Sequence, residues 1–297
     1  MPVFLIIILA ILGGLIVLLF IALLSIYLHI FYSPKKWQLN DFNLNGPFYK
    51  GMEDQVIPLI NSIREIPYED AYITSFDKLK LHARIYINPS SKKVAVLCHG
   101  YRGTPCRDFS GGAVEVIKLG YNVVLIDERA HGLSKGHTIT FGVREVQDVI
   151  DWVKYARKRF GEDCELALIG ISMGGNVVLT AADKVGKVKI VADCPYSSPR
   201  IMLRHTIKEM KLPVPIFYPL LNLTSIVFGR ANLNKASAYD SIKNTTNKVL
   251  IIHGDSDVVV PHFISEDLFR AYPNKIQYEL RTDFSSVSCA GWINIGS

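Results

Sequence analysis

One serine lies in a sequence pattern that could make it a nucleophile. Ser172 stands in Gly170-Ile171-Ser172-Met173-Gly174-Gly175, directly after the apolar run LALIGI and directly before NVVLTAADKV. A G-x-S-x-G pattern between a strand and a helix is typical of a nucleophile elbow, whose tight turn projects the hydroxyl from the carboxyl edge of a sheet. The start of the following helix adds main-chain N–H groups and a positive dipole end. The pattern therefore indicates acyl transfer through a serine.

Two main-chain N–H groups could stabilise the negative charge that acyl transfer develops on oxygen. The strand-like run VAVLC leads into His99-Gly100-Tyr101-Arg102-Gly103. The reaction needs one donor directly after the nucleophile and another from an earlier strand-to-helix loop. We expect the N–H groups of Met173 and Tyr101 to fill these two places.

The acid that orients a catalytic imidazole is expected beyond the serine in the chain. The run KVLIIHGDSDVVVP carries two candidates, Asp255 and Asp257. Asp257 is the predicted acid because it lies further into the loop, whereas Asp255 fits an Asx-type turn. Asp193, after the run KIVA, is a third candidate of lower weight.

A histidine in the upstream half of the chain could be mistaken for the base. His131 belongs to Asp127-x-Arg129-x-His131-Gly132-x-Ser134, which follows the run NVVLI. It lies beside the wrong strand for the chain order Ser…Asp…His. We assign it a structural role in a loop that charge-assisted hydrogen bonds hold together.

Short apolar runs alternate with helix-length amphipathic segments from Tyr68 onward. YEDAYITS and LKLHARIYIN are expected to form a hairpin around residues 76–78, and five buried strands follow in VAVLCHG, NVVLIDE, LALIGIS, KIVADCP and KVLIIHG. FSGGAVEVIKLG and VREVQDVIDWVKYARKRFG have helical spacing and end at Gly120 and Gly161. This alternation predicts an α/β domain, residues 68–297, with a mostly parallel sheet.

Two segments depart from this alternation. Residues 33–67 are expected to be a connector with one short helix near residues 53–64, which Pro58 should interrupt. Residues 197–234 are too long for an ordinary connection and too apolar for a solvated loop, so we interpret them as a helical cap over the strand ends. A second membrane-contacting element is the less favoured interpretation, because charged residues interrupt the segment: Arg204, Lys208, Glu209, Lys211 and Arg230.

The N-terminal segment is uncharged and strongly apolar. Val3 to Leu28 contains 26 residues with a single serine, and as a helix it would rise about 39 Å, enough to cross a hydrocarbon core of about 30 Å. A cleaved signal peptide usually has a shorter apolar stretch and a basic start, and a buried soluble helix would rarely be so long and unbroken. We therefore predict a single-pass anchor over residues 1–32, with the membrane contacted through residues 3–28.

The orientation of this anchor follows from flanking charge and from cysteine usage. Lys35 and Lys36 follow the span and no basic residue precedes it, so the positive-inside bias favours a cytoplasmic domain. An odd number of cysteines without zinc-type spacing fits a reducing compartment: Cys98, Cys106, Cys164, Cys194 and Cys289. The N-x-Thr sequons at Asn222 and Asn244 matter only if the domain is secreted.

Overall charge argues against a nucleic-acid partner. The chain has 33 Lys and Arg against 27 Asp and Glu, a net charge of +6 that is scattered over 297 residues. No block of like charge and no zinc-finger or RNP-type spacing occurs in the sequence.

Four motifs in order give the chain a resemblance to a known superfamily. From about Tyr68 to Leu280, with HGYRG, DERAHGLS, GISMGG and HGDSDVVVP, it resembles α/β-hydrolases of the bacterial membrane-anchored or cytosolic type related to serine aminopeptidases, monoacylglycerol lipases and carboxylesterases. The resemblance implies an eight-stranded sheet and a cap between the sixth and seventh strands. It also implies hydrolysis of an ester, thioester or amide without a metal or organic cofactor. The apolar cap favours a hydrophobic substrate, either a small molecule or a peptide- or lipid-like compound.

The resemblance also implies a catalytic histidine after the eighth strand, beyond residue 280, and the sequence has none there. The last histidine, His262, adjoins Pro261 and is expected to start a helix and point away from the site. The catalytic base is therefore unknown, and the tail 281–297 is atypical. A truncated or frame-altered end of an ordinary hydrolase is the favoured explanation, and a natural loss of the base is the alternative. The chain as written is expected to be catalytically impaired, or to be a non-catalytic binding protein.

Overall fold

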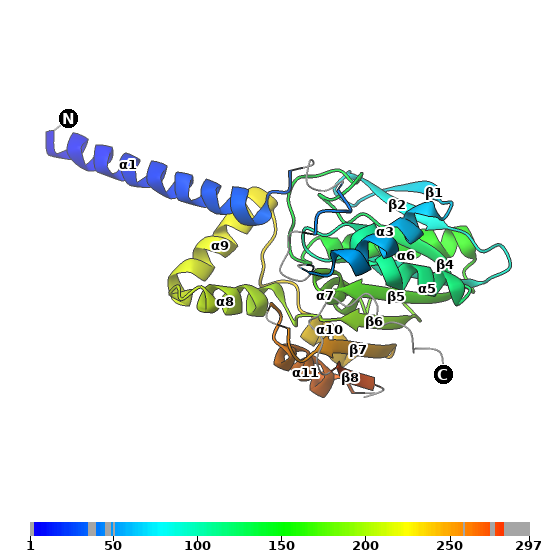
Figure 1. The fold of residues 1–297 in the computed structure, drawn as a ribbon. Coiled ribbons are helices and arrows are strands. Elements are labelled where there is room, and N and C mark those ends of the chain that lie inside the picture. The colour runs from blue at the N-terminus through cyan, green and yellow to red at the C-terminus, as the bar shows by residue number, and fades with distance from the viewer. Residues whose placement is uncertain are drawn as a thin grey trace.

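An eight-stranded sheet lies at the centre of the computed structural model, which describes residues 3–34, 40–44, 49, 51–257, 259–273 and 277–281 (Figure 1). The strand order is β1-β2-β4-β3-β5-β6-β7-β8. β2 pairs antiparallel with β1 and β4, and all other pairs are parallel. The strands are β1 Glu69–Thr74, β2 Lys80–Tyr86, β3 Lys93–Cys98, β4 Asn122–Ile126, β5 Glu165–Ile171, β6 Lys189–Asp193, β7 Lys248–Gly254 and β8 Gln277–Arg281. The predicted sheet is confirmed.

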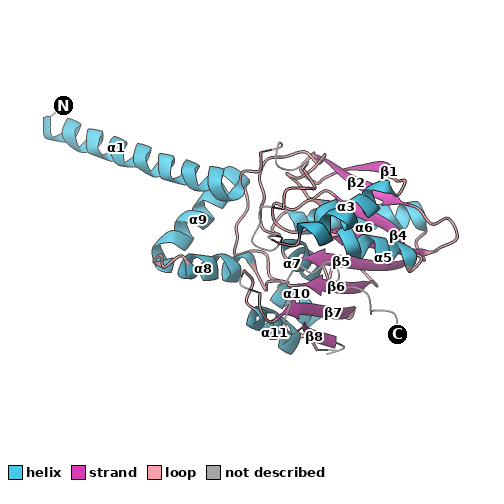
Figure 2. Ribbon diagram, viewed as in Figure 1, coloured by secondary structure: helices cyan, strands magenta, loops and turns pink. Residues whose placement is uncertain are grey.

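Helices cover both faces of this sheet because β3 and its neighbours are apolar on both sides (Figure 2). Val94 and Val96 of β3 pack in one cluster with α6 Glu145–Phe160, α7 Met173–Thr180, α10 Ala238–Asn244 and α11 His262–Ala271. Ala95 and Leu97 face the opposite way, toward α3 Glu53–Glu65 and α5 Ser110–Lys118. The short α4 Pro105–Asp108 precedes α5.

Helix α3 lies in the segment expected to be a connector. It runs through Pro58 without interruption, so the predicted break is wrong. One side of α3 buries Val56, Ile60 and Ile63, and the helix packs on α5. This apolar contact stabilises the helix despite the hydrogen bond that proline cannot donate.

Two helices form the insertion between β6 and β7. They are α8 Pro199–Glu209 and α9 Val214–Gly229, which pack against each other and lie to one side of the sheet (Figure 1). Ser198 caps α8 by accepting a hydrogen bond from the N–H of Ile201. The expected helical cap between the sixth and seventh strands is confirmed.

The N-terminal helix α1, Val3–Ile26, projects away from the domain and continues into a π-helical turn, Tyr27–Phe31 (Figure 1). The helical stretch is long and apolar enough to cross a membrane. Its end is part of the domain: Phe31 is fully buried, and its carbonyl oxygen accepts a 2.8 Å hydrogen bond from the N–H of Ile139. The N–H of Ser33 likewise donates to His137 O at 2.9 Å. Residues 31–33 therefore join the helix to the domain.

Candidate active site

Ser172 occupies the turn between β5 and α7 in a strained backbone conformation. Its φ of 53° and ψ of −110° lie outside the regions that serine ordinarily adopts. The N–H of Ser172 donates a 2.8 Å hydrogen bond to Asp193 O at the end of β6, which holds the turn in place. Ser172 is half-buried between buried Ile171 and Met173, and its hydroxyl makes no hydrogen bond to a described residue. Such strain is retained where the surrounding structure enforces it, and it is concentrated at functional sites.

Glycines around Ser172 make this turn possible. A Cβ atom at Gly174 would lie 2.0 Å from Cys98 O, and one at Gly170 would lie 2.2 Å from Gly174 O. The first turn of α7 can therefore approach β3 and β5 only without these side chains. The sequence pattern predicted this elbow, and the geometry of the turn agrees with the prediction.

The loop after β3 lies beside the serine. A Cβ atom at Gly100 would lie 3.6 Å from Ser172 Cβ, so the main chain at residues 100–101 borders the hydroxyl. Among the residues that the structure describes, the N–H groups of Tyr101 and Met173 donate to no acceptor. Both residues belong to one apolar cluster, together with Val260 of the loop after β7. The predicted donors thus flank Ser172.

Asp108 holds the loop after β3 in shape, a role that the sequence analysis did not assign. Its Oδ2 accepts a 3.0 Å hydrogen bond from the N–H of Gly100, and its Oδ1 accepts from Tyr49 Oη and Arg107 Nε. Burial would raise the pKa of Asp108, but the charge of Arg107 and these hydrogen bonds hold it below its ordinary value. A buried carboxylate with this many donors is expected to fix the loop geometry. An aspartate eight residues after a strand-end glycine gives no recognisable sequence signal.

Two neutral histidines attach the same loop to the loop after β4. His99 Nδ1–H donates to Gly100 O at 2.8 Å, and its Nε2 accepts from the N–H of Glu128 at 3.1 Å. His131 Nδ1–H donates to Arg129 O at 2.9 Å, and its Nε2 accepts from the N–H of Arg102 at 3.1 Å. Burial lowers the pKa of both imidazoles. All four ring nitrogens are occupied, so the structural role assigned to His131 agrees with its contacts.

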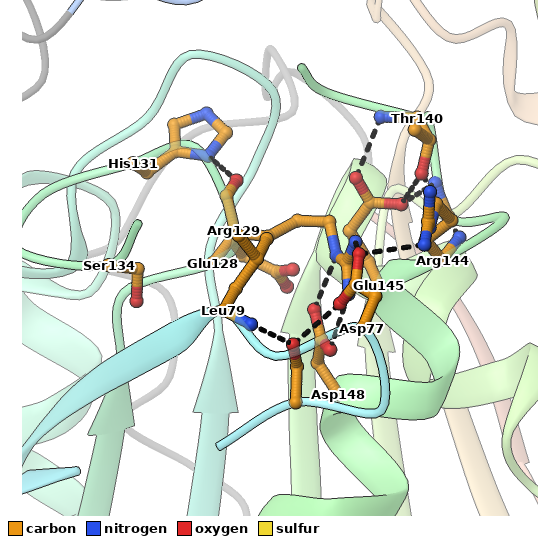
Figure 3. Close-up of polar contacts among 12 residues, drawn as sticks. Asp77, Leu79, Glu128, Arg129, His131, Ser134, Thr140, Arg144, Glu145 and Asp148 are labelled. Atoms are coloured by element: carbon orange, nitrogen blue, oxygen red, sulfur yellow. Dashed lines mark hydrogen bonds and ion pairs between the residues drawn. The ribbon is translucent and has the colours of Figure 1, made fainter. Parts of the chain in front are cut away.

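Arg129 anchors the loop after β4 through buried ion pairs (Figure 3). Its guanidinium lies between two carboxylates, with Nε 2.6 Å from Asp148 Oδ2 and Nη1 3.1 Å from Asp77 Oδ2. Ser134 Oγ closes the loop by donating to Asp127 O at 2.7 Å. The predicted charge-assisted hydrogen bonds in this loop are confirmed.

Glu128 lies next to this network and is fully buried. Neither of its carboxylate oxygens has a hydrogen-bond partner among the described residues (Figure 3). Burial raises the pKa of Glu128 well above its ordinary value, and the carboxylates of Glu145 and Asp148 raise it further. The side chain is therefore expected to be a neutral carboxylic acid.

The loop after β7 is built around Asp257. Its Oδ1 accepts hydrogen bonds from the N–H groups of Val259 at 2.8 Å and Val260 at 2.9 Å. Its buried Oδ2 lies 3.2 Å from His253 Nε2, whose N–H donates to Val260 O. Asp255 is more exposed and accepts from Ser256 Oγ. Asp257, the predicted acid, makes an Asx-type turn with the N–H of Val259. Asp193 contributes its carbonyl oxygen to the elbow.

No described histidine forms a hydrogen bond with Ser172. All eight histidines fall in the described ranges, and His262 begins α11 as expected, with its Nε2 3.7 Å from Glu266 Oε1. Residues 282–297, where the resemblance implies the catalytic base, lie outside the described residues.

Comparisons with known proteins agree with this geometry. Residues 89–224 match the family model described as serine aminopeptidase, S33. The esterase Pf2001 of Pyrococcus furiosus superposes with a TM-score of 0.60 at 25% identity, covering 76% of this chain and 85% of that one. The uncharacterized protein YqkD of Bacillus subtilis is 27% identical over 52% of both chains, and the thiohydrolase aneE of Aspergillus aculeatus is 27% identical over 50% of this chain and 46% of its own. The chain thus spans about half the length of the curated relatives it matches.

Proposed function

The chain has the α/β-hydrolase fold, and on that premise we propose that it is a membrane-anchored serine hydrolase that cleaves an ester, thioester or amide through an acyl-enzyme on Ser172. The observation that carries the proposal is the strained elbow, with a hydroxyl that bonds no described residue between two N–H groups without acceptors. This is the arrangement that nucleophilic acyl transfer requires.

The proposed reaction has two steps. Ser172 Oγ attacks the substrate carbonyl carbon, the carbonyl π electrons move to oxygen, and the N–H groups of Tyr101 and Met173 bind the resulting oxyanion. The oxyanion collapses, the leaving group departs with a proton, and an acyl ester remains on Ser172. Water then attacks the acyl carbon of this ester, the bond from that carbon to Oγ breaks, and a proton from water returns to Oγ as the acid is released. Asp257 is the proposed acid that orients the base, and no described residue is assigned as that base.

The cap favours an apolar acyl group, and the relatives favour an ester or thioester bond. Leu203 and Ile207 of α8 pack with Tyr218 and Leu221 of α9, and this cluster extends to the ring of Tyr101 in the oxyanion loop. One relative is named an esterase and another a thiohydrolase. We therefore propose esters and thioesters of hydrophobic acids as the substrates to test before amides.

We also propose that α1 is a single-pass anchor with the domain in the cytoplasm. Three of the described cysteines, Cys98, Cys106 and Cys164, are buried free thiols, as suits a reducing compartment. Protease treatment of right-side-out vesicles tests the orientation. Protection of the domain is expected, and digestion from outside would reverse the assignment.

The activity test uses the purified 297-residue chain with a graded series of p-nitrophenyl esters, the matching thioesters and aminoacyl anilides. Ester hydrolysis is expected to be slow, about 10³–10⁴-fold over water, because oxyanion stabilisation and binding act without an assigned base. Ser172→Ala should abolish it, and Ser90→Ala, on an exposed loop far from the site, should leave it unchanged. Equal rates for Ser172→Ala and wild type would refute the proposed nucleophile.

A second candidate is a hydrolase-fold protein that binds a ligand without turnover. The observation that favours it is the absence of any described histidine bonded to Ser172. Saturable binding of a long-chain ester, with no hydrolysis above the Ser172→Ala background, would support this candidate over the enzyme.

A further inference from the structure

Helix α9 carries no charged residue over its sixteen positions. In the sequence, five charged residues made membrane contact by the cap the less favoured interpretation. All five lie outside α9. Arg204, Lys208 and Glu209 belong to α8, Lys211 lies in the turn after it, and Arg230 follows the end of α9. The structure therefore separates an apolar helix from the charges that flank it.

One side of α9 exposes a row of apolar side chains that we call the α9 stripe: Ile216, Leu223, Ile226 and Val227, which are 59%, 39%, 42% and 51% exposed. The exposed Pro219 lies between the first two. Their spacing of three or four residues places them on one face of the helix. The opposite face buries Tyr218 and Leu221 against the cap. An exposed apolar face of this length marks an interaction surface.

The α9 stripe is continuous with the N-terminal helix. Phe228, at the end of α9, stacks on Tyr27 with ring centroids 4.9 Å apart, and lies 6.0 Å from the ring of Phe20. Figure 1 shows α9 leaving the base of α1 and leading to α8 on the side of the domain from which α1 projects. Residues of α1 are exposed and apolar over almost its whole length. Both surfaces therefore face the same surroundings.

Contacts at the base of α1 fix this arrangement. Tyr27 Oη lies 2.8 Å from Thr138 Oγ1 in a hydrogen bond, and Arg102 Nη2 donates to His29 O at 2.7 Å. Because the helix joins the domain through side-chain and main-chain bonds, the domain cannot turn freely about it. In this arrangement a membrane that held α1 would meet the face of the domain that carries α9.

We propose that α9 lies in the surface of the membrane that α1 enters, with the α9 stripe at the boundary between headgroups and acyl chains. The inference rests on the anchor in the proposed function. Sixteen residues span about 24 Å as a helix, too short to cross a bilayer. A helix with one exposed apolar face can lie at this boundary, and the exposed Lys208 and Lys211, which precede α9 in the cap, supply the basic residues that favour a lipid surface.

This placement specifies how substrate arrives. The buried side of α9 belongs to the apolar cluster that contains Phe141 and Tyr101, whose rings stack with centroids 4.9 Å apart. Packed apolar side chains thus connect α9 with the oxyanion loop. The proposed substrate is therefore an amphiphile that carries an acyl chain and enters the site from the membrane.

Depth-dependent quenching tests the placement in the full-length chain. Leu223→Cys and Ile226→Cys, each combined with Cys289→Ser, are labelled with the environment-sensitive fluorophore NBD. The other cysteines are buried. The matched control is Leu119→Cys, 50% exposed at the end of α5 on another part of the domain. Each variant is used only if its melting temperature equals that of the wild-type protein. Val227→Cys replaces a stripe variant whose melting temperature falls.

In phosphatidylcholine vesicles with nitroxide-bearing acyl chains, both stripe probes should lose at least about half their fluorescence, while the probe at residue 119 should not. Flotation of the same vesicles shows whether α1 has inserted. Failure to float would refute the anchor. Flotation with unquenched stripe probes would overturn only the placement of α9. Energy transfer between two labelled copies without lipid quenching would assign the stripe to a second copy and would also overturn it.

Discussion

The phenol hydroxyl of Tyr101 donates a 2.6 Å hydrogen bond to the main-chain carbonyl oxygen of Ile30. The bond joins the loop that carries a proposed oxyanion donor to the turn that ends the N-terminal helix. The ring of Phe31 packs edge-on against Phe141, on which Tyr101 stacks. The end of the proposed anchor is therefore part of the support of the active site.

Two truncations distinguish the membrane attachment made by α1 from the stabilisation of the domain by the turn that follows it. Deleting residues 1–24 removes most of α1 but keeps the turn, whereas deleting residues 1–32 also removes Phe31 and the carbonyl partner of Tyr101. We expect both proteins to leave the membrane fraction, and the longer deletion to lose about 3–5 kcal/mol of unfolding free energy, as for loss of a buried phenylalanine. Phe31→Ala in the full chain is the matched variant. Equal stability of the two truncations in urea would contradict this prediction.

Asp108→Asn should disturb the oxyanion loop. The amide keeps the shape of the carboxylate but leaves Arg107 without its buried counter-charge, and in either orientation its NH2 group meets a donor, the N–H of Gly100 or those of Arg107 and Tyr49. Since loss of one oxyanion donor costs about 10²–10³ in kcat, we expect kcat to fall by at least about tenfold with little change in KM. Asp163→Asn, at an exposed ion pair, is the control. A fall in folded fraction with unchanged kcat per folded molecule would make Asp108 a stability residue only.

Glu128→Gln should change the pH dependence of stability. The folded-state pKa of Glu128 is raised, so between its unfolded value of about 4.5 and its folded value the native chain binds the extra proton. The stabilisation from protonated Glu128 is complete below pH 4.5. It is lost as the pH rises toward the folded-state pKa, at about 1.4 kcal/mol of unfolding free energy per pH unit. Glutamine does not ionise. The free energy of unfolding of Glu128→Gln, measured by urea titration, should therefore rise relative to that of wild type between pH 5 and pH 8. Parallel curves would show that Glu128 ionises in the folded protein.

The same titration contains an opposite contribution from histidine. The pKa values of His99 and His131 are lowered in the folded chain, so below about pH 6.5 the unfolded chain binds more protons and stability falls with falling pH. Wild type and Glu128→Gln share this contribution. The difference between the two curves therefore isolates Glu128.

Added imidazole should distinguish the two acids of the loop after β7. A small base could take the serine proton if Asp257 orients it. Ester hydrolysis by the 297-residue chain is expected to rise with imidazole to saturation, above the Ser172→Ala background. Asp257→Asn should remove most of this rescue and Asp255→Asn little, because Asp257 is the proposed acid and Asp255 is not. Equal rescue by imidazole in the two variants would refute the assignment of Asp257 as the acid.

Patterns set by local chemistry could be predicted from the sequence. The elbow at Ser172 requires glycines and a strand-to-helix change, and both are visible in consecutive residues. The buried strands are visible as apolar runs. The support of the site was not predictable in this way, because Asp108, Tyr49 and Ile30 meet the loop after β3 only through tertiary contacts. The helix break expected at Pro58 does not occur, because packing of α3 outweighs the local preference of proline.

The proposed nucleophile is tested most directly by mass spectrometry of the purified 297-residue chain after reaction with a fluorophosphonate. Attack of Ser172 Oγ on phosphorus, with departure of fluoride, is expected to be slow because the oxyanion donors act without an assigned base, so the reaction is followed to completion. We predict one adduct, on the peptide that contains Ser172, formed in wild type and in Ser90→Ala and absent from Ser172→Ala. An adduct on another residue, or one that persists in Ser172→Ala, would contradict the assignment of Ser172.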